Sequence, residues 1–181
     1  MRWTAWLGRR WPTALAVALA VPTVGGGQSA DEVRSLADVL VMLPLEYLVV
    51  AKLQRRQASW PVAVTAIAFV IGLRALDVIA PSGVLSAVAL IVLIWGAVDR
   101  QLHRSGGFRV QALGMVGFGA VAVAGLVIDP DLGRYVVAAG WFLHGVWDFV
   151  YLKLDKVVTR SYAEWCGVID NLIAAELVFL P

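Results

Sequence analysis

Seven stretches of mostly Val, Leu, Ala, Ile, Gly and Phe follow one another along the chain, separated by short polar or turn-forming segments. The apolar runs are continuous rather than alternating, which favours helices over strands. Most have a length close to the ~20 residues that a helix needs to cross a membrane. The pattern predicts one all-α domain, residues 1–181, built as a polytopic transmembrane helical bundle. The seven expected spans are 13–24, 36–51, 60–79, 84–98, 110–128, 133–152 and 162–180.

The first apolar run is short for a span, and it has two interpretations. Arg9 and Arg10 precede it and three glycines follow it, a pattern also typical of a secretory signal peptide whose removal would leave six spans. Trp11 and Pro12 instead suit the first turn of a retained helix, because proline is well tolerated there. We favour the retained helix, and both interpretations give the rest of the chain the same orientation.

Composition supports a membrane protein. Hydrophobic residues make up 60% of the chain and charged residues only 15%, whereas soluble domains have about 25% charged residues. The net charge of +2 gives no reason to expect a nucleic-acid partner. The high share of hydrophobic residues makes the lipid bilayer the expected surroundings. Cys166 is the single cysteine, which excludes an intrachain disulfide and a cysteine-based zinc site.

The basic residues predict an orientation. With the N-terminus in the cytoplasm and seven spans threaded, only Arg34, Arg74 and Arg134 of the 15 Lys and Arg residues lie outside or towards the outside. The positive-inside rule asks for this asymmetry. We therefore expect a multi-pass protein of the inner (plasma) membrane, with its N-terminus inside and its C-terminus outside. The basic residues placed inside are Arg2, Arg9, Arg10, Lys52, Arg55, Arg56, Arg100, Arg104, Arg109, Lys153, Lys156 and Arg160.

The sixth span carries ionisable residues that are costly inside a membrane and usually functional. His144 lies ~15 Å below the outer end of the span and Asp148 ~6 Å deeper. Trp141, His144, Asp148 and Tyr151 follow spacings of three, four and three residues, so they share one helix face.

Two carboxyl groups on other spans lie at a similar depth. Asp170 lies ~12 Å from the inner end of the last span. Glu46 lies near the middle of the second span, two residues after Pro44, a position where a kink is expected. These residues with His144 and Asp148 predict either a buried hydrogen-bond network or a functional pocket, and we favour the pocket.

A shallower polar set lies towards the outer face. Arg74 and Glu176 both lie ~20 Å from the inner face, so they can form an ion pair. Asp38 is the other candidate partner of Arg74. We expect one of these pairs to have a structural role, because charges in the membrane are rarely left unpaired. The alternative is that these residues form part of an outer vestibule.

The sequence predicts no cofactor and no metal site. One histidine and three carboxylates could hold a divalent ion, but the spans contain neither a second histidine nor a Glu-x-x-His pair. His103 falls in an expected cytoplasmic loop, which disfavours a bis-histidine haem, and the last span has no lysine for a retinal Schiff base. No P-loop, dinucleotide-binding fingerprint or nucleophile elbow occurs.

The closing third of the chain carries His144-x-x-Trp147-Asp148 in one span and Cys166-x-x-x-Asp170 near the start of the next. In these features it resembles a family of small polytopic membrane proteins from high-GC bacteria, and the resemblance implies topology only. A fainter, chemical similarity is to the emopamil-binding-type sterol isomerases. Their bundles place histidine and acidic residues around a lipophilic, amine-binding cavity, although the order of spans differs here. That similarity implies a pocket for a lipophilic ligand.

Three functions follow, of which the first is preferred. A pocket between the second, sixth and seventh spans would bind a lipophilic or cationic small molecule or relay protons, with His144 titrating, Asp148 orienting it, and Asp170 and Glu46 as counter-charges. A non-catalytic accessory or assembly subunit would instead use the fifth span against a membrane protein partner or a second copy. An enzyme acting on an isoprenoid or sterol-like lipid is the lesser alternative. The small residues of the fifth span are Gly114, Gly117, Gly119, Ala120, Ala124 and Gly125.

Overall fold

The computed structural model describes residues 10–21, 29–77, 79–103 and 106–180, and in these residues the chain is helical and contains no strand. The all-helical prediction is therefore confirmed. The elements are α2 (Trp11–Ala20), α3 (Ala30–Leu53), the short 3₁₀-helix η2 (Arg56–Ala58), α4 (Ser59–Leu76), α5 (Pro81–Val98), α6 (Gly107–Val127), α7 (Pro130–Leu154) and α8 (Arg160–Phe179).

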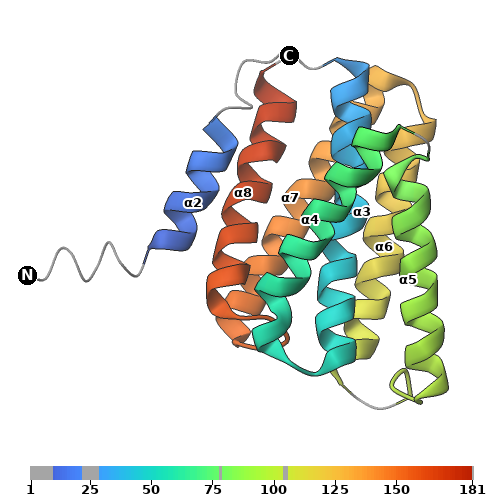
Figure 1. The fold of residues 1–181 in the computed structure, drawn as a ribbon. Helices are drawn as coiled ribbons and strands as arrows, with labels where there is room; N and C mark the ends of the chain where they lie inside the picture. Colours follow the sequence, from blue (N-terminus) through green and yellow to red (C-terminus); the bar gives the residue numbers. More distant parts are fainter. Residues whose placement is uncertain (1–9, 22–28, 78, 104–105, 181) are drawn as a thin grey trace, which may run out of the picture.

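The helices α3 to α8 run alternately up and down and form one bundle (Figure 1). Helix α3 lies at its centre, where it contacts α4, α5, α6 and α7. Helix α8 packs against α7 on one side and against the shorter α2 on the other. The buried acidic residues Glu46 of α3 and Asp170 of α8 are thereby surrounded by other helices.

The ends of the helices are encoded locally. Ser29 and Glu32 form a capping box at the start of α3, in which each side chain accepts a hydrogen bond from the other residue's backbone N–H. Pro12 and Pro81 lie in the first turns of α2 and α5. Gln54, just after α3, has a left-handed conformation (φ 54°) that stops the helix.

Four stretches of the described chain are long and apolar enough to cross a membrane: Arg56–Leu76, Pro81–Val98, Gly107–Val127 and Asp131–Leu154. Helices α3 and α8 are also long, but charged residues are spread along them, six in α3 and four in α8. A central helix can carry such residues because its neighbours shield it from lipid. Helix α2 has only 10 residues. The seven-span count therefore stays a prediction.

Apolar side chains cover the outside of the bundle, and the ionisable residues of its middle lie inside. Val98 and Val127 are 73% and 75% exposed, whereas Glu46 is only 2% exposed. Soluble proteins rarely expose large apolar patches. The distribution suits a protein whose solvent is hydrocarbon.

One end of the bundle gathers basic residues. Lys52 ends α3, Arg56 precedes α4 and Arg160 begins α8, so the alternating topology places them at the same end. Lys52 pairs with Asp99 and lies 4.2 Å from the centre of the Trp95 ring. This arrangement is typical of a membrane–water interface.

Candidate functional site

The site begins with a close approach of α7 to α8. His144 and Asp148 lie one turn apart on α7, and Asp170 faces them from α8. Gly145 allows this approach, because a Cβ atom there would lie 3.2 Å from Cβ of Asp170 and would meet the side chain of Asn171. The Asn171 amide is held in turn by a 2.7 Å hydrogen bond to the Gly167 carbonyl.

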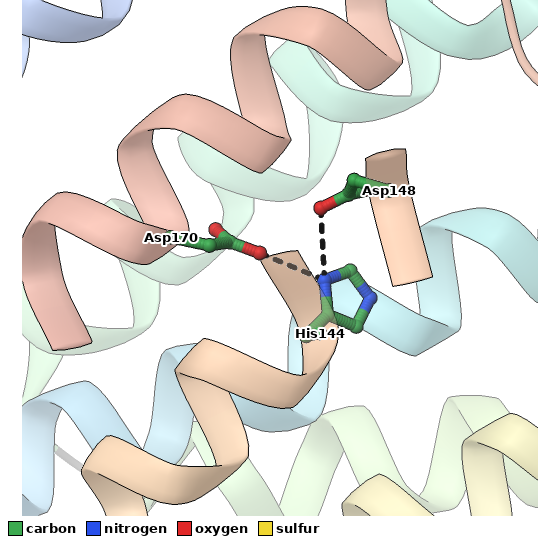
Figure 2. A group of neighbouring side chains, drawn as sticks. All are labelled: His144, Asp148 and Asp170. Carbon is green, nitrogen blue, oxygen red and sulfur yellow. Dashed lines mark hydrogen bonds and ion pairs between the residues drawn. The ribbon is translucent and has the colours of Figure 1, made fainter. Parts of the chain in front are cut away.

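Two carboxylates converge on one nitrogen of His144 (Figure 2). Nδ1 of His144 lies 2.8 Å from Oδ2 of Asp170 and 3.2 Å from Oδ2 of Asp148. His144 is 1% exposed and both aspartates are 0% exposed. We call these three residues the His144 cluster.

The His144 cluster has fewer hydrogen-bond donors than its carboxylate oxygens require. Nδ1 carries at most one hydrogen, so it can make a full, linear hydrogen bond to only one of the two carboxylates. Within the described residues, Oδ2 of Asp148, Oδ1 of Asp170 and Nε2 of His144 have no hydrogen-bond partner. Two ionised carboxylates and one imidazolium would also leave a net negative charge in a buried site. The geometry therefore suits a cation between the three groups, either an additional proton or a metal ion.

Side chains from α3 and α6 hold the cluster in place. The Tyr47 hydroxyl donates a 2.6 Å hydrogen bond to Oδ1 of Asp148. The rings of Phe118 and Tyr47 stand edge-on to the imidazole, with centroids 5.0 and 5.8 Å from it. Four helices thus restrict the orientation of the imidazole and of Asp148.

Glu46 lies outside the His144 cluster and forms a second polar pair. Its Oε2 accepts a hydrogen bond from the Tyr162 hydroxyl, and its Oε1 has no hydrogen-bond partner within the described residues. The ring of Tyr162 lies 6.1 Å from the ring of Tyr47, and the Tyr47 hydroxyl is hydrogen-bonded to Asp148. The two tyrosines therefore lie between Glu46 and the His144 cluster. Glu46 lies at a depth similar to that of His144, but its hydrogen-bond partner is Tyr162 and not His144.

A groove of about 400 Å³ runs between α3, α4 and α5, and Glu46 lies in its wall. Glu46 is the only charged residue among the described residues that line it. Leu53 and Phe69, each 43% exposed, also line the groove, which places part of it at the surface of the bundle. This cavity lies beside α4 and α5, whereas the sequence predicted a pocket between the second, sixth and seventh spans.

Trp141 and Tyr151 flank the His144 cluster along α7. The Trp141 indole N–H donates a 3.1 Å hydrogen bond to the Leu36 carbonyl, which ties α7 to α3. The Tyr151 ring lies 5.4 Å from the rings of both Tyr47 and Trp147. Both residues thus share the predicted face with His144, but their contacts are those of helix packing.

Two of the three shallower charged residues, Arg74 and Asp38, lie where α3, α4 and α5 meet. Arg74 lies 3.9 Å from Oδ2 of Asp38 and donates a 2.7 Å hydrogen bond to the Ser35 carbonyl. Asp38 accepts a 3.3 Å hydrogen bond from the backbone N–H of Ser82. Glu176 lies on α8 and is 9% exposed. Of the two expected partners of Arg74, Asp38 is the one placed beside it.

Sequence reasoning did not select four residues that shape the site: Tyr47, Tyr162, Phe118 and Gly145. A signal existed for Tyr162, because it precedes Asp170 by eight residues and therefore shares its helix face. Phe118 comes from α6, and nothing in the local sequence connects it with His144.

Two of the six small residues of α6, Gly114 and Gly125, are buried against α7, whereas Gly117 and Ala120 are exposed. A Cβ atom at Gly114 would lie 3.2 Å from the Trp147 ring, and one at Gly125 would meet the side chain of Val137. Gly117 is different, since a Cβ atom there would meet no atom within 4 Å.

Comparisons with protein-family models, with curated proteins and with solved structures found no match to this chain.

Proposed function

We propose that this chain is an integral membrane protein that binds a lipophilic, positively charged small molecule, with Glu46 as the counter-charge. The observation that carries the proposal is the groove between α3, α4 and α5, whose lining is apolar except for Thr65 and the carboxyl of Glu46. Ligand sites are typically of this kind, apolar with a few polar groups that fix orientation.

The positive charge of the proposed ligand follows from the burial and hydrogen bonding of the Glu46 carboxyl. Its carboxyl is buried, and Tyr162 satisfies one oxygen while the other has no partner in the described residues. An ionised carboxylate in a membrane needs a cation or additional hydrogen bonds. An ammonium group supplies both, and its hydrocarbon chain would lie against groove residues such as Val49, Phe69 and Leu85.

The first test compares three ligands that share one alkyl chain. Dodecylamine should raise the unfolding temperature of the protein in nanodiscs, whereas dodecanol and dodecyl sulfate should do so much less. Glu46→Gln should weaken dodecylamine binding at least tenfold, about 1.4 kcal/mol. Titrations followed by thermal unfolding measure both effects.

Two variants make this test specific. Thr65 is exposed and lines the groove, so Thr65→Trp should block binding without disturbing the bundle. Glu164→Gln is the matched control, since that carboxyl pairs with Arg10 and Thr13 away from the groove. Equal responses to all three ligands, or unchanged binding by Thr65→Trp, would show that the groove is not the site.

We also propose seven spans in the inner membrane, with the basic end of the bundle in the cytoplasm. Gln57→Cys at the basic end and Leu132→Cys at the other test this, because both positions are exposed and the single native cysteine, Cys166, is buried. In intact cells a membrane-impermeant maleimide should label only Leu132→Cys. Labelling of Gln57→Cys alone would mean that the basic end of the bundle faces outside, opposite to the proposed orientation.

A further inference from the structure

We infer that His144, Asp148 and Asp170 form a binding site for a divalent metal ion. This inference goes beyond the proposed ligand, because it concerns the buried contact between α7 and α8 and does not use Glu46 or the groove. It replaces the expectation, drawn from sequence spacing, that the chain holds no metal.

The positions of the ligand atoms suit a metal. One atom from each of the three residues lies within 4.8 Å of the others. A tetrahedral ion with bonds of ~2.1 Å holds its ligand atoms ~3.4 Å apart. The distances from Nδ1 of His144 to the two carboxylates, 2.8 and 3.2 Å, need only a small expansion to reach that spacing.

Charge supports a divalent ion. In the described residues, neither Asp148 nor Asp170 is paired with a lysine or arginine, and His144 is their shared partner. An imidazolium would leave one negative charge uncompensated, whereas a divalent ion with a neutral imidazole leaves none. Buried charge without compensation is costly, and most costly in a membrane.

The surroundings also resemble those of a metal site. Metal-binding carboxylates are usually held by a second hydrogen bond, and Tyr47 supplies one to Oδ1 of Asp148 while Oδ2 remains directed at His144. Oδ1 of Asp170 has no partner within the described residues and could provide a further oxygen.

The donor set indicates the class of metal. One imidazole nitrogen and carboxylate oxygens suit Zn²⁺, Mn²⁺, Fe²⁺ or Co²⁺ rather than metals that prefer sulfur. Cys166 lies on the same helix as Asp170, but it is not among the three residues whose ligand atoms converge.

The experiment measures metal on the whole protein in nanodiscs. The protein is purified, its metal content is determined by mass spectrometry, and metal-depleted protein is then titrated with Zn²⁺, Mn²⁺ and Co²⁺. We expect about one tightly held ion per chain. X-ray absorption of the Zn²⁺ form should show one imidazole, oxygen ligands and no sulfur.

Variants assign the ligands and separate the two proposals. His144→Gln and Asp170→Asn should each lose the ion, whereas Glu164→Gln should retain it. Thr65→Trp should lose dodecylamine but keep the metal, so failure of either proposal is visible without the other. If a variant does not fold, the absorption spectrum of the unaltered protein still decides, because sulfur ligation or the lack of an imidazole would overturn the assignment.

A helical protein that retains no ion at micromolar concentrations of any of the three metals would also overturn it. A proton shared by the three residues would then be the cation in the site.

Discussion

His144→Ala is expected to lower the free energy of unfolding by about 3–5 kcal/mol, the largest effect of any single substitution considered. The imidazole is the shared partner of Asp148 and Asp170, both fully buried. Its removal leaves two carboxylates facing each other in a fully buried site. Reversible denaturant unfolding in mixed micelles, followed by circular dichroism, measures the loss.

A triple variant tests whether charge is the cause. His144→Leu combined with Asp148→Asn and Asp170→Asn removes the ionisable groups while nearly preserving the volume, so it should recover much of the lost stability. Equal destabilisation by the single and triple variants would instead show that packing against Phe118 and Tyr47 dominates.

Gly145→Leu is expected to cost about 1–3 kcal/mol and to disrupt the His144 cluster. The new side chain would occupy the space of Asn171 and Asp170, so α8 must move away from α7. That movement separates Asp170 from His144 because they lie on different helices. Unfolding measurements give the cost, and the metal titration reports the state of the site.

Gly117→Leu is the matched control, as it places the same side chain on a helical glycine. A Cβ atom at Gly117 meets no atom within 4 Å, so this variant should be as stable as the unaltered protein or slightly more stable. Similar losses from both substitutions would mean that the close contact at Gly145 does not determine the geometry of the site.

The limits of sequence prediction are clear at α3. Hydropathy placed the start of this span at residue 36, whereas the helix begins at Ala30. The additional turns are polar and contain Asp31 and Glu32, so they carry no apolar signal. The Ser29–Glu32 capping box sets the start instead, and it was recognisable from the sequence.

The candidate site was also only partly predictable from the sequence. The four-residue spacing of His144 and Asp148 requires one helix face, so that pair was predictable. Depth along a helix placed Asp170 and Glu46 at one level, but it says nothing about lateral position. The structure brings Asp170 to His144 and leaves Glu46 beside Tyr162 and the groove.

The sequence by itself determined that the protein is helical, where its apolar runs lie and that ionisable groups share one face of α7. These properties follow from local spacing and composition, which a single chain segment contains. Only the tertiary structure decided which helices lie at the centre, that Gly145 lets α8 approach, and that two carboxylates converge on one nitrogen. Those outcomes depend on contacts between side chains that are distant in sequence. How such side chains pack is determined only when all the helices are in place.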